Sequence, residues 1–283
     1  MRSMRCLEIN MGVDFAFIDS GTGGFPYMKY LLKKAPGAEC VYVGDIKNFP
    51  YGNRTPQNIL ECLTPLFTEL ISRFNPKTIV IACNTISVSA LDCLRQKFPD
   101  IPIVGTVPAI KLAAGCSKNK KIGLLATNVS VNHPYTQKLI SDFARDCQVF
   151  KRGDPELISF IEHNLFTATK EERLNAIKPA VEYFKNCGCD TIILACTHFV
   201  NFVDGFNELC SPQIKVLDSR EGVVKQALKV EGFDFNKLKV SGEIPKSRLF
   251  VRGLKNKSQD VEYRTLCENN GVQWCGEFDN SAE

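Results

Sequence analysis

Two cysteines stand at matching places in the sequence, each at the end of an apolar run and each followed by two hydrogen-bonding side chains. Cys83 follows the run TIVIA and precedes an Asn-Thr pair, and Cys196 follows TIILA and precedes a Thr-His pair. A thiol between a buried strand and a helix N-terminus lies where its thiolate is stabilised and can act as a base or a nucleophile. A single cysteine in such a run is usually a small buried hydrophobe, but two sites with one layout favour a duplicated acid–base site.

Metal binding is the alternative use of these residue types. The cysteines and the histidine between positions 187 and 198 include a Cys-Gly-Cys and a Cys-x-His, but no pair has the spacing of a structural zinc site. We therefore expect no metal. His198 lies beside a strand-end thiol, as a proton partner would. His133 and His163 lie in or near helical patterns and are expected at the surface.

Two loops could contact a ligand. The motif DSGTGG, which begins at Asp19, has three glycines that let the backbone turn and bring N–H groups to the start of a helix, where an anion is stabilised. Its alternative reading is a tight turn capped by Asp19 or Ser20. The segment 43–55 is either a surface loop closed by turn residues or a loop whose Tyr51 and Gly52 present a hydroxyl and backbone groups to a ligand.

Short apolar runs alternate with longer helical patterns along most of the chain. This alternation is typical of βαβ units and predicts a mostly parallel sheet. We expect strands at about 13–18, 40–44, 78–82, 102–105, 120–126, 191–195 and 215–217, and helices at about 24–35, 55–74, 87–98, 108–116, 130–144, 154–164, 170–186 and 199–210.

The order of motifs is similar in the two halves of the chain. A strand ending in DSGTGG precedes the strand that ends in CNT, and a strand ending in ATNVS precedes the strand that ends in CTH. Two α/β units of similar layout are expected. Because ligands of parallel sheets bind beyond the carboxyl ends of the strands, the two units should face each other across one cleft. The more polar tail after about residue 235 is expected to pack back on the first unit.

Composition narrows the class of protein. With 44% hydrophobic and 23% charged residues in 283, the chain can build one large or two moderate globular cores. Its net charge of +4 is spread along the chain without a basic block, so nucleic acid is not an expected partner. The 13 cysteines are odd in number and many lie in apolar runs, which favours reduced thiols in a cytoplasmic protein.

The beginning of the chain has no signal-peptide pattern. MRSMRCLEINMG lacks an apolar core, and we expect residues 1–11 to be a dispensable leader with Met4 or Met11 as alternative starts. No run is long enough to span a bilayer, so no membrane association is expected.

The motifs DSGTGG, PYG, CNT and CTH, in this order and spacing, resemble those of the glutamate racemases, within the cofactor-independent aspartate/glutamate racemase superfamily. The resemblance covers about residues 13–230. It implies an α/β fold of two similar domains with mostly parallel sheets flanked by helices and the active site in the inter-domain cleft. The first domain would comprise 12–105 plus 215–283, and the second 106–214. It also implies glutamate as substrate, no cofactor, and compatibility with a homodimer.

The resemblance assigns roles to individual residues. Cys83 and Cys196 match the two catalytic cysteines, which act on opposite faces of the substrate α-carbon. Asp19 would assist Cys83. His198 would assist Cys196, and Glu162 aligns with a family glutamate near that cysteine. The residues that match substrate-binding positions are Asp19, Ser20, Tyr51, Gly52, Asn84, Thr85, Thr197 and His198.

The chemistry of inversion agrees with paired thiols. Inverting a carbon requires a base on one face and an acid on the other, because a single group tends to return the proton to the side it left. Without a pyridoxal cofactor, the carbanion must be stabilised by hydrogen bonds in a cleft that excludes water. After CTH the chain has Phe199 and Val200, where the family usually has Tyr-Pro.

The expected activity is interconversion of L- and D-glutamate, supplying peptidoglycan precursor synthesis. One alternative is a racemase for aspartate or another acidic amino acid. A second alternative is a racemase-like binding or regulatory protein with little turnover. The presence of both Cys83 and Cys196 argues against the second alternative, because a protein without turnover has no need of two acid–base groups.

Overall fold

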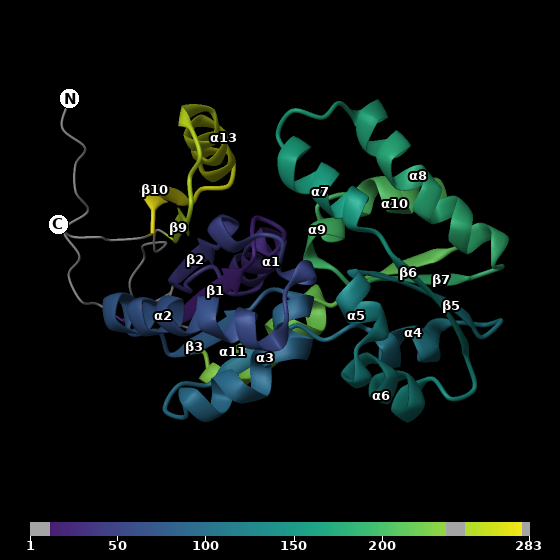
Figure 1. Cartoon of the computed structure of the whole chain (residues 1–283), viewed down its shortest axis with the longest axis horizontal. Helices are drawn as coiled ribbons and strands as arrows, with labels where there is room; N and C mark the ends of the chain where they lie inside the picture. The colour runs from purple at the N-terminus through teal and green to yellow at the C-terminus, as the bar shows by residue number, and fades with distance from the viewer. Residues whose placement is uncertain (1–11, 236–246, 279–283) are drawn as a thin grey trace.

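The structure, a computed structural model, describes residues 12–235 and 247–278. The predicted leader at residues 1–11 lies outside the described residues, and so does the part of the polar tail at 236–246. Figure 1 shows two groups of elements, each built around its own sheet. The predicted α/β fold with parallel sheets flanked by helices is confirmed.

The first sheet has six strands in the order β10-β9-β2-β1-β3-β4, and each neighbouring pair is parallel. Strands β1, β2 and β3 are buried along their whole length because helices cover both faces, so they read in the sequence as continuous apolar runs. The strands are β1 (Phe15–Asp19), β2 (Cys40–Gly44), β3 (Thr78–Ile81), β4 (Ile103–Gly105), β9 (Arg248–Val251) and β10 (Gln273–Glu277).

Helices lie on both faces of this sheet. Phe15 and Phe17 of β1 belong to one core cluster, and the alternate residues Ala16 and Ile18 belong to another. The first cluster is covered by α1 (Phe25–Lys34), α11 (Arg220–Glu231) and α13 (Lys257–Glu268), and the second by α2 (Pro56–Phe74) and α3 (Asn84–Lys97). Two 3-10 helices, η1 (Ile46–Asn48) and η2 (Tyr51–Asn53), lie between β2 and α2.

The second sheet has four parallel strands in the order β6-β5-β7-β8. Its strands are β5 (Lys121–Ala126), β6 (Gln148–Gly153), β7 (Thr191–Leu194) and β8 (Lys215–Leu217). One of its core clusters contains residues of α7 (Pro155–Asn164), α8 (Lys170–Asn186), α9 (Thr197–Val200) and α10 (Val203–Cys210). The other contains residues of α4 (Ile110–Cys116), α5 (Asn128–Asn132) and α6 (Pro134–Phe143).

Most expected elements are present, but four places differ. The helix predicted at 130–144 is divided into α5 and α6 at His133, because the residue before a proline disfavours helical backbone. The helix predicted at 199–210 is divided into α9 and α10. Strand β6 was not expected, since an edge strand with the sequence QVFKRG is only partly buried and has no apolar run. Helix α11 was not expected either.

The chain returns to the first group of elements after β8. Strand β8 pairs with β7 in the second sheet. The following helix, α11, packs against α1, and its Val223 and Val224 join the first sheet's core. Among residues 12–235 and 247–278, no helix has both the length and the apolar character needed to cross a bilayer. The cysteines in these two ranges form no disulfide bonds.

Candidate active site

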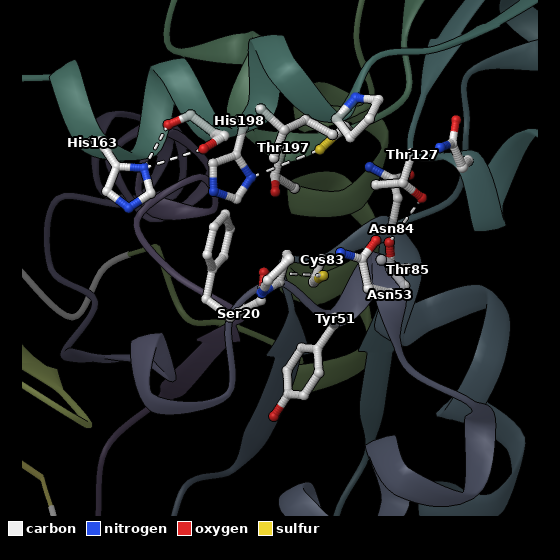
Figure 2. Close-up of a pocket in the computed structure, with 18 of the residues that line it drawn as sticks. Ser20, Tyr51, Asn53, Cys83, Asn84, Thr85, Thr127, His163, Thr197 and His198 are labelled. Atoms are coloured by element: carbon white, nitrogen blue, oxygen red, sulfur yellow. Dashed lines mark hydrogen bonds between the residues drawn. The ribbon is translucent and has the colours of Figure 1, made fainter.

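The carboxyl ends of strands from both sheets meet at one cavity of about 330 Å³. Figure 2 shows Cys83, Asn84 and Thr85 on one side of it and Thr197 and His198 on the other. The predicted site residues that line the cavity are Ser20, Tyr51, Gly52, Cys83, Asn84, Thr85, Cys196, Thr197 and His198. The two remaining predicted residues, Asp19 and Glu162, lie behind this wall in contact with residues that form it.

The two cysteines have nearly the same local geometry. Cys83 (φ −145°, ψ 119°) is the N-cap residue of α3, and Cys196 (φ −136°, ψ 136°) is the N-cap residue of α9. Each therefore extends its strand by a residue or two before the chain turns into a helix. Both are 5% exposed and both line the cavity. The matching layout read from the sequence is thus a matching geometry around one space.

Cys83 is held close to Asp19. The Cys83 thiol donates a hydrogen bond to Ser20 Oγ at 3.9 Å. Burial, followed by the charge of Asp19, raises the pKa of Cys83 well above 9.0 and favours the thiol. Burial also raises the pKa of Asp19, whose carboxylate accepts the Gly24 N–H at 2.7 Å. Asp19 is fully buried behind the cavity wall, where its carboxyl group interacts with the Cys83 thiol.

Cys196 is backed by an imidazole and a carboxylate. His198 Nδ1 lies 3.7 Å from Cys196 Sγ, and His198 Nε2 lies 2.8 Å from Glu162 Oε2. Burial opposes a charge on His198, yet its hydrogen bonds to Cys196 and Glu162 raise its pKa well above 6.5. Burial acts against Glu162 too, but hydrogen bonds from His198 and Thr22 lower its pKa. Cys196 therefore lies next to an acid–base partner, His198, that Glu162 holds in place from behind.

The glycines of DSGTGG allow the second group of elements to approach the first. A Cβ atom on Gly21 would lie 2.7 Å from Glu162 Oε1, and one on Gly23 would lie 2.6 Å from His198 Nδ1. Real Cβ atoms essentially never show such short distances, so a side chain at position 21 would displace Glu162 and one at position 23 would displace His198. The predicted turn held by Asp19 is confirmed by its hydrogen bond with the Gly24 N–H. Anion binding by this loop stays a prediction.

Comparison with known proteins places this geometry in a family. The family model described as Asp/Glu/Hydantoin racemase matches residues 27–227. The chain belongs to the Asp/Glu/hydantoin racemase family. It is 35% identical to the glutamate racemase of Treponema pallidum (strain Nichols) over 271 residues, covering 94% of this chain and 96% of the relative. It is 39% identical to that of Bartonella tribocorum over 212 residues, covering 74% and 77% of the two chains.

Solved structures of glutamate racemases have the same fold. The Escherichia coli enzyme, in complex with L-glutamate and the activator UDP-MurNAc-Ala, superposes with a TM-score of 0.79 at 26% identity, covering 94% of this chain and 98% of the other. The Campylobacter jejuni enzyme superposes with a TM-score of 0.68 at 26% identity, covering 88% and 96%. The resemblance drawn from the four motifs is confirmed.

Tyr51 differs from its expected orientation in this family member. Its hydroxyl donates a hydrogen bond to the buried carboxylate of Asp45, which also accepts from Asn48. Figure 2 shows the hydroxyl pointing away from the cavity. The prediction that Tyr51 presents its hydroxyl to a ligand is therefore wrong, because Asp45 binds it. Tyr51 and Gly52 still line the cavity beside it.

Several cavity residues of this racemase-family chain were not predicted. Thr127 directly follows β5, and its hydroxyl lies 3.1 Å from that of Thr85, across the join between the two sheets. The ATNVS segment occupies the same place in the second half of the sequence as DSGTGG in the first, and this similarity could have predicted Thr127 as a site residue. Phe49, His163 and Lys255 also line the cavity. His163 is exposed, as expected, and lies at the cavity edge near Phe49.

Asn84 carries unused hydrogen-bonding capacity. It is 1% exposed, and neither its Oδ1 nor its Nδ2 has a hydrogen-bond partner within the described residues. A buried amide without partners is costly unless a ligand or water supplies them. Because Asn84 lines the cavity, its amide is suited to binding a carboxylate there.

The two residues that follow CTH, Phe199 and Val200, lie in the core of the protein. Phe199 is fully buried and packs edge-on against Phe206 of α10. Val200 is buried in the core cluster of the first sheet. Neither is among the residues that line the cavity, so this pair packs behind the site. In the described part of the chain, no three His, Cys, Asp or Glu residues are grouped as a metal site would need.

Proposed function

We propose that this protein interconverts L- and D-glutamate without a cofactor, using Cys83 and Cys196 as the two acid–base groups. The observation that carries the proposal is that two buried thiols at matching strand ends line one cavity, and each has its own proton partner. The names of the relatives, glutamate racemases at 35–39% identity, support glutamate as the substrate.

The reaction is one proton removed and one proton added. The thiolate on one face takes the α-proton and becomes a thiol, and the thiol on the other face gives its proton to the carbanion and becomes a thiolate. The imidazolium of His198 stabilises the thiolate of Cys196. Protonated Asp19 can stabilise the thiolate of Cys83, because a neutral carboxyl group has a proton to donate. Each turnover leaves the two thiols with exchanged protonation states.

Hydrogen-bond donors around the cavity suit the carboxylates of the substrate. The candidate donors are Ser20, Gly52, Asn84, Thr85, Thr127 and Thr197. Donors fixed in a buried site stabilise negative charge that develops in the transition state more strongly than water does. We propose that they hold the α-carboxylate, where the carbanion's charge is delocalised, and the side-chain carboxylate.

The cellular context belongs to the same proposal. We propose that the protein supplies D-glutamate to peptidoglycan synthesis in the cytoplasm and forms a homodimer, as the resemblance of its motifs implies. We also propose that the two sheets mark two domains that divide near residues 105 and 215, with β8 remaining with the second.

The test is racemisation of each enantiomer by the purified protein, followed by circular dichroism in the presence of a chelator and without pyridoxal phosphate. Glutamate should turn over much faster than aspartate, alanine or glutamine. In deuterium oxide, the product should carry deuterium at the α-carbon while the remaining substrate stays mostly unlabelled. Faster turnover of aspartate would reassign the substrate, and binding without turnover would indicate a regulatory protein.

Cysteine variants test the two-base mechanism. Cys83→Ala and Cys196→Ala should each lower kcat/KM by roughly 10²- to 10⁴-fold, equally in both directions because the enantiomers have equal energy. Cys93→Ala is the matched control, since Cys93 is an exposed thiol on α3. A Cys196→Ala enzyme with near-parental activity would show that one thiol suffices.

A further inference from the structure

A residue that belongs to the other sheet donates hydrogen bonds to the carboxylate of Glu162. Glu162 lies on α7, beside the four-stranded sheet, and its Oε2 accepts two hydrogen bonds from Thr22 in the loop after β1 of the six-stranded sheet. The Thr22 hydroxyl donates at 2.8 Å and the Thr22 N–H at 3.2 Å. His198 Nε2 approaches the same oxygen at 2.8 Å. Three donors from two groups of elements thus converge on one carboxylate oxygen.

This cluster is buried. The side chains of Glu162 and His198 are 7% and 3% exposed, and Thr22 is 1% exposed. A buried carboxylate needs its hydrogen bonds, because losing a donor leaves negative charge without solvation. Glycine at position 21 lets the loop lie directly against Glu162. The fit between loop and carboxylate is therefore close.

The two thiols differ in which group of elements supplies their acid–base partners. Asp19 ends β1 and Cys83 follows β3 of the six-stranded sheet, so their mutual contact lies within one group of elements, and the other group adds a longer hydrogen bond from the Thr197 hydroxyl to Asp19 at 3.5 Å. The relay from Cys196 through His198 to Glu162 ends on Thr22, which belongs to the other group. Cys196 therefore has its full set of partners only when the two sheets are closed on each other.

We propose that Thr22 is a positioning residue for proton transfer at Cys196, which completes the His198–Glu162 pair when the cleft closes. This inference rests on the proposed racemase function. Without the Thr22 hydroxyl, Glu162 competes for the proton of His198, and the thiolate of Cys196 loses the positive charge that stabilises it. Proton transfer at Cys83 keeps its own partners.

The test compares Thr22→Val with Thr22→Ser. Valine has the shape of threonine without its hydroxyl, and serine keeps the hydroxyl without the methyl group. Thr22→Val should lower kcat by roughly 10- to 100-fold, as expected for one hydrogen bond to a charged group, and Thr22→Ser should restore most of it. Equal losses in both variants would assign Thr22 to packing and overturn the proposal.

Isotope effects locate the affected step. With α-deuterated L- and D-glutamate, a slower transfer at Cys196 raises the primary isotope effect for the enantiomer that Cys196 deprotonates and lowers it for the other. Cys196→Ser and Cys83→Ser identify which enantiomer belongs to which thiol. Thr22→Val should change the two isotope effects in the same sense as Cys196→Ser. A change in the same direction as in Cys83→Ser, or isotope effects that stay equal for the two enantiomers, would contradict the proposal.

A second readout does not need turnover. Iodoacetamide alkylation of each cysteine, followed by peptide mass spectrometry, should be slower at Cys196 in Thr22→Val than in Thr22→Ser and unchanged at Cys83. An equal Cys196 rate in the two variants overturns the role of Thr22 whatever the activity. A parental protein that does not racemise glutamate while Cys196 alkylation still responds to Thr22→Val would instead overturn the proposed function and leave the positioning role supported.

Discussion

At the scale of single residues, the two thiols obtain acid–base partners of opposite kind. Cys83 lies near a buried carboxyl group whose pKa is raised, and Cys196 lies near an imidazole whose pKa is raised. The balance of causes differs: at Asp19 burial outweighs the nearby charge of His198, whereas at His198 the hydrogen bonds to Cys196 and Glu162 outweigh burial. A neutral acid and a cation can each supply a proton to a thiolate, so two different partners serve the same chemistry.

The His198–Glu162 pair should make stability depend on pH in a defined window. The raised pKa of His198 gives stability that is complete below 6.5 and is lost progressively as pH rises through the raised value. The lowered pKa of Glu162 gives stability that is complete above 4.5 and is lost as pH falls through the lowered value. Both contributions are therefore complete between pH 4.5 and 6.5.

Glu162→Gln should lower the unfolding midpoint most in that window. Removing one partner of a buried pair costs about 3–5 kcal/mol, or roughly 6–20 °C for a chain of this size. Thermal unfolding followed by circular dichroism from pH 3 to pH 9 measures the difference. A difference that stays constant across this range would show that the pair is not ionised in the folded protein.

At the scale of elements, the site depends on how strands end. Parallel strands present their carboxyl ends at one edge, and the second residue after β3 and after β7 keeps an extended backbone before a helix begins. That geometry directs both thiols to the cavity. The loop after β1 then lies against α7 and α9, since two of its glycines leave no side chain in the way.

Gly23→Ala should open this contact. The added Cβ would lie 2.6 Å from His198 Nδ1 and 2.8 Å from its backbone nitrogen, and the backbone cannot move as a side-chain tip can. Displacement of His198 by about 1 Å should lower kcat/KM by roughly 100-fold. Gly222→Ala on α11 is the matched control, because within the described residues a Cβ there has no neighbour inside 4 Å. Steady-state kinetics of both variants test this prediction. Equal kcat/KM in Gly23→Ala and Gly222→Ala would mean that the loop adapts to the added methyl group.

At the scale of the whole molecule, the cavity lies where polar contacts join the two sheets. Thr85 meets Thr127 on one side, and Thr22 meets Glu162 on another. A ligand that touches both walls adds contacts between the two groups of elements. Its binding free energy is then also a contribution to the stability of the closed arrangement.

Glutamate should therefore stabilise the Cys83→Ala variant, in which interconversion of the enantiomers is slowed. At 100 times Kd the expected gain is about 2.7 kcal/mol, seen as a rise of several degrees in the unfolding midpoint. Alanine is the ligand control because it has no second carboxylate, and Asn84→Ala in the same background should weaken the rise. An equal rise with alanine would contradict binding of the side-chain carboxylate.

The sequence determined the features that depend on residues next to one another in the chain. The apolar run before Cys83 makes a buried strand, and the polar pair after it starts a helix, so the thiol must lie at a strand end. The same holds for Cys196. Alternation of strands and helices predicted parallel sheets, because a crossover helix returns the chain to the same direction. Two strand-end thiols and two similar units followed from these local patterns.

The tertiary structure decided which distant side chains meet. Thr22 and Glu162 are 140 positions apart, and no periodicity relates them. The hydroxyl of Tyr51 turns from the cavity because a buried carboxylate, Asp45, lies within its reach. Thr127 enters the cavity wall because the second sheet closes on Thr85. Such pairings depend on how two packed units fit together, and that fit is set by the side chains of many elements at once, so no short stretch of sequence contains it.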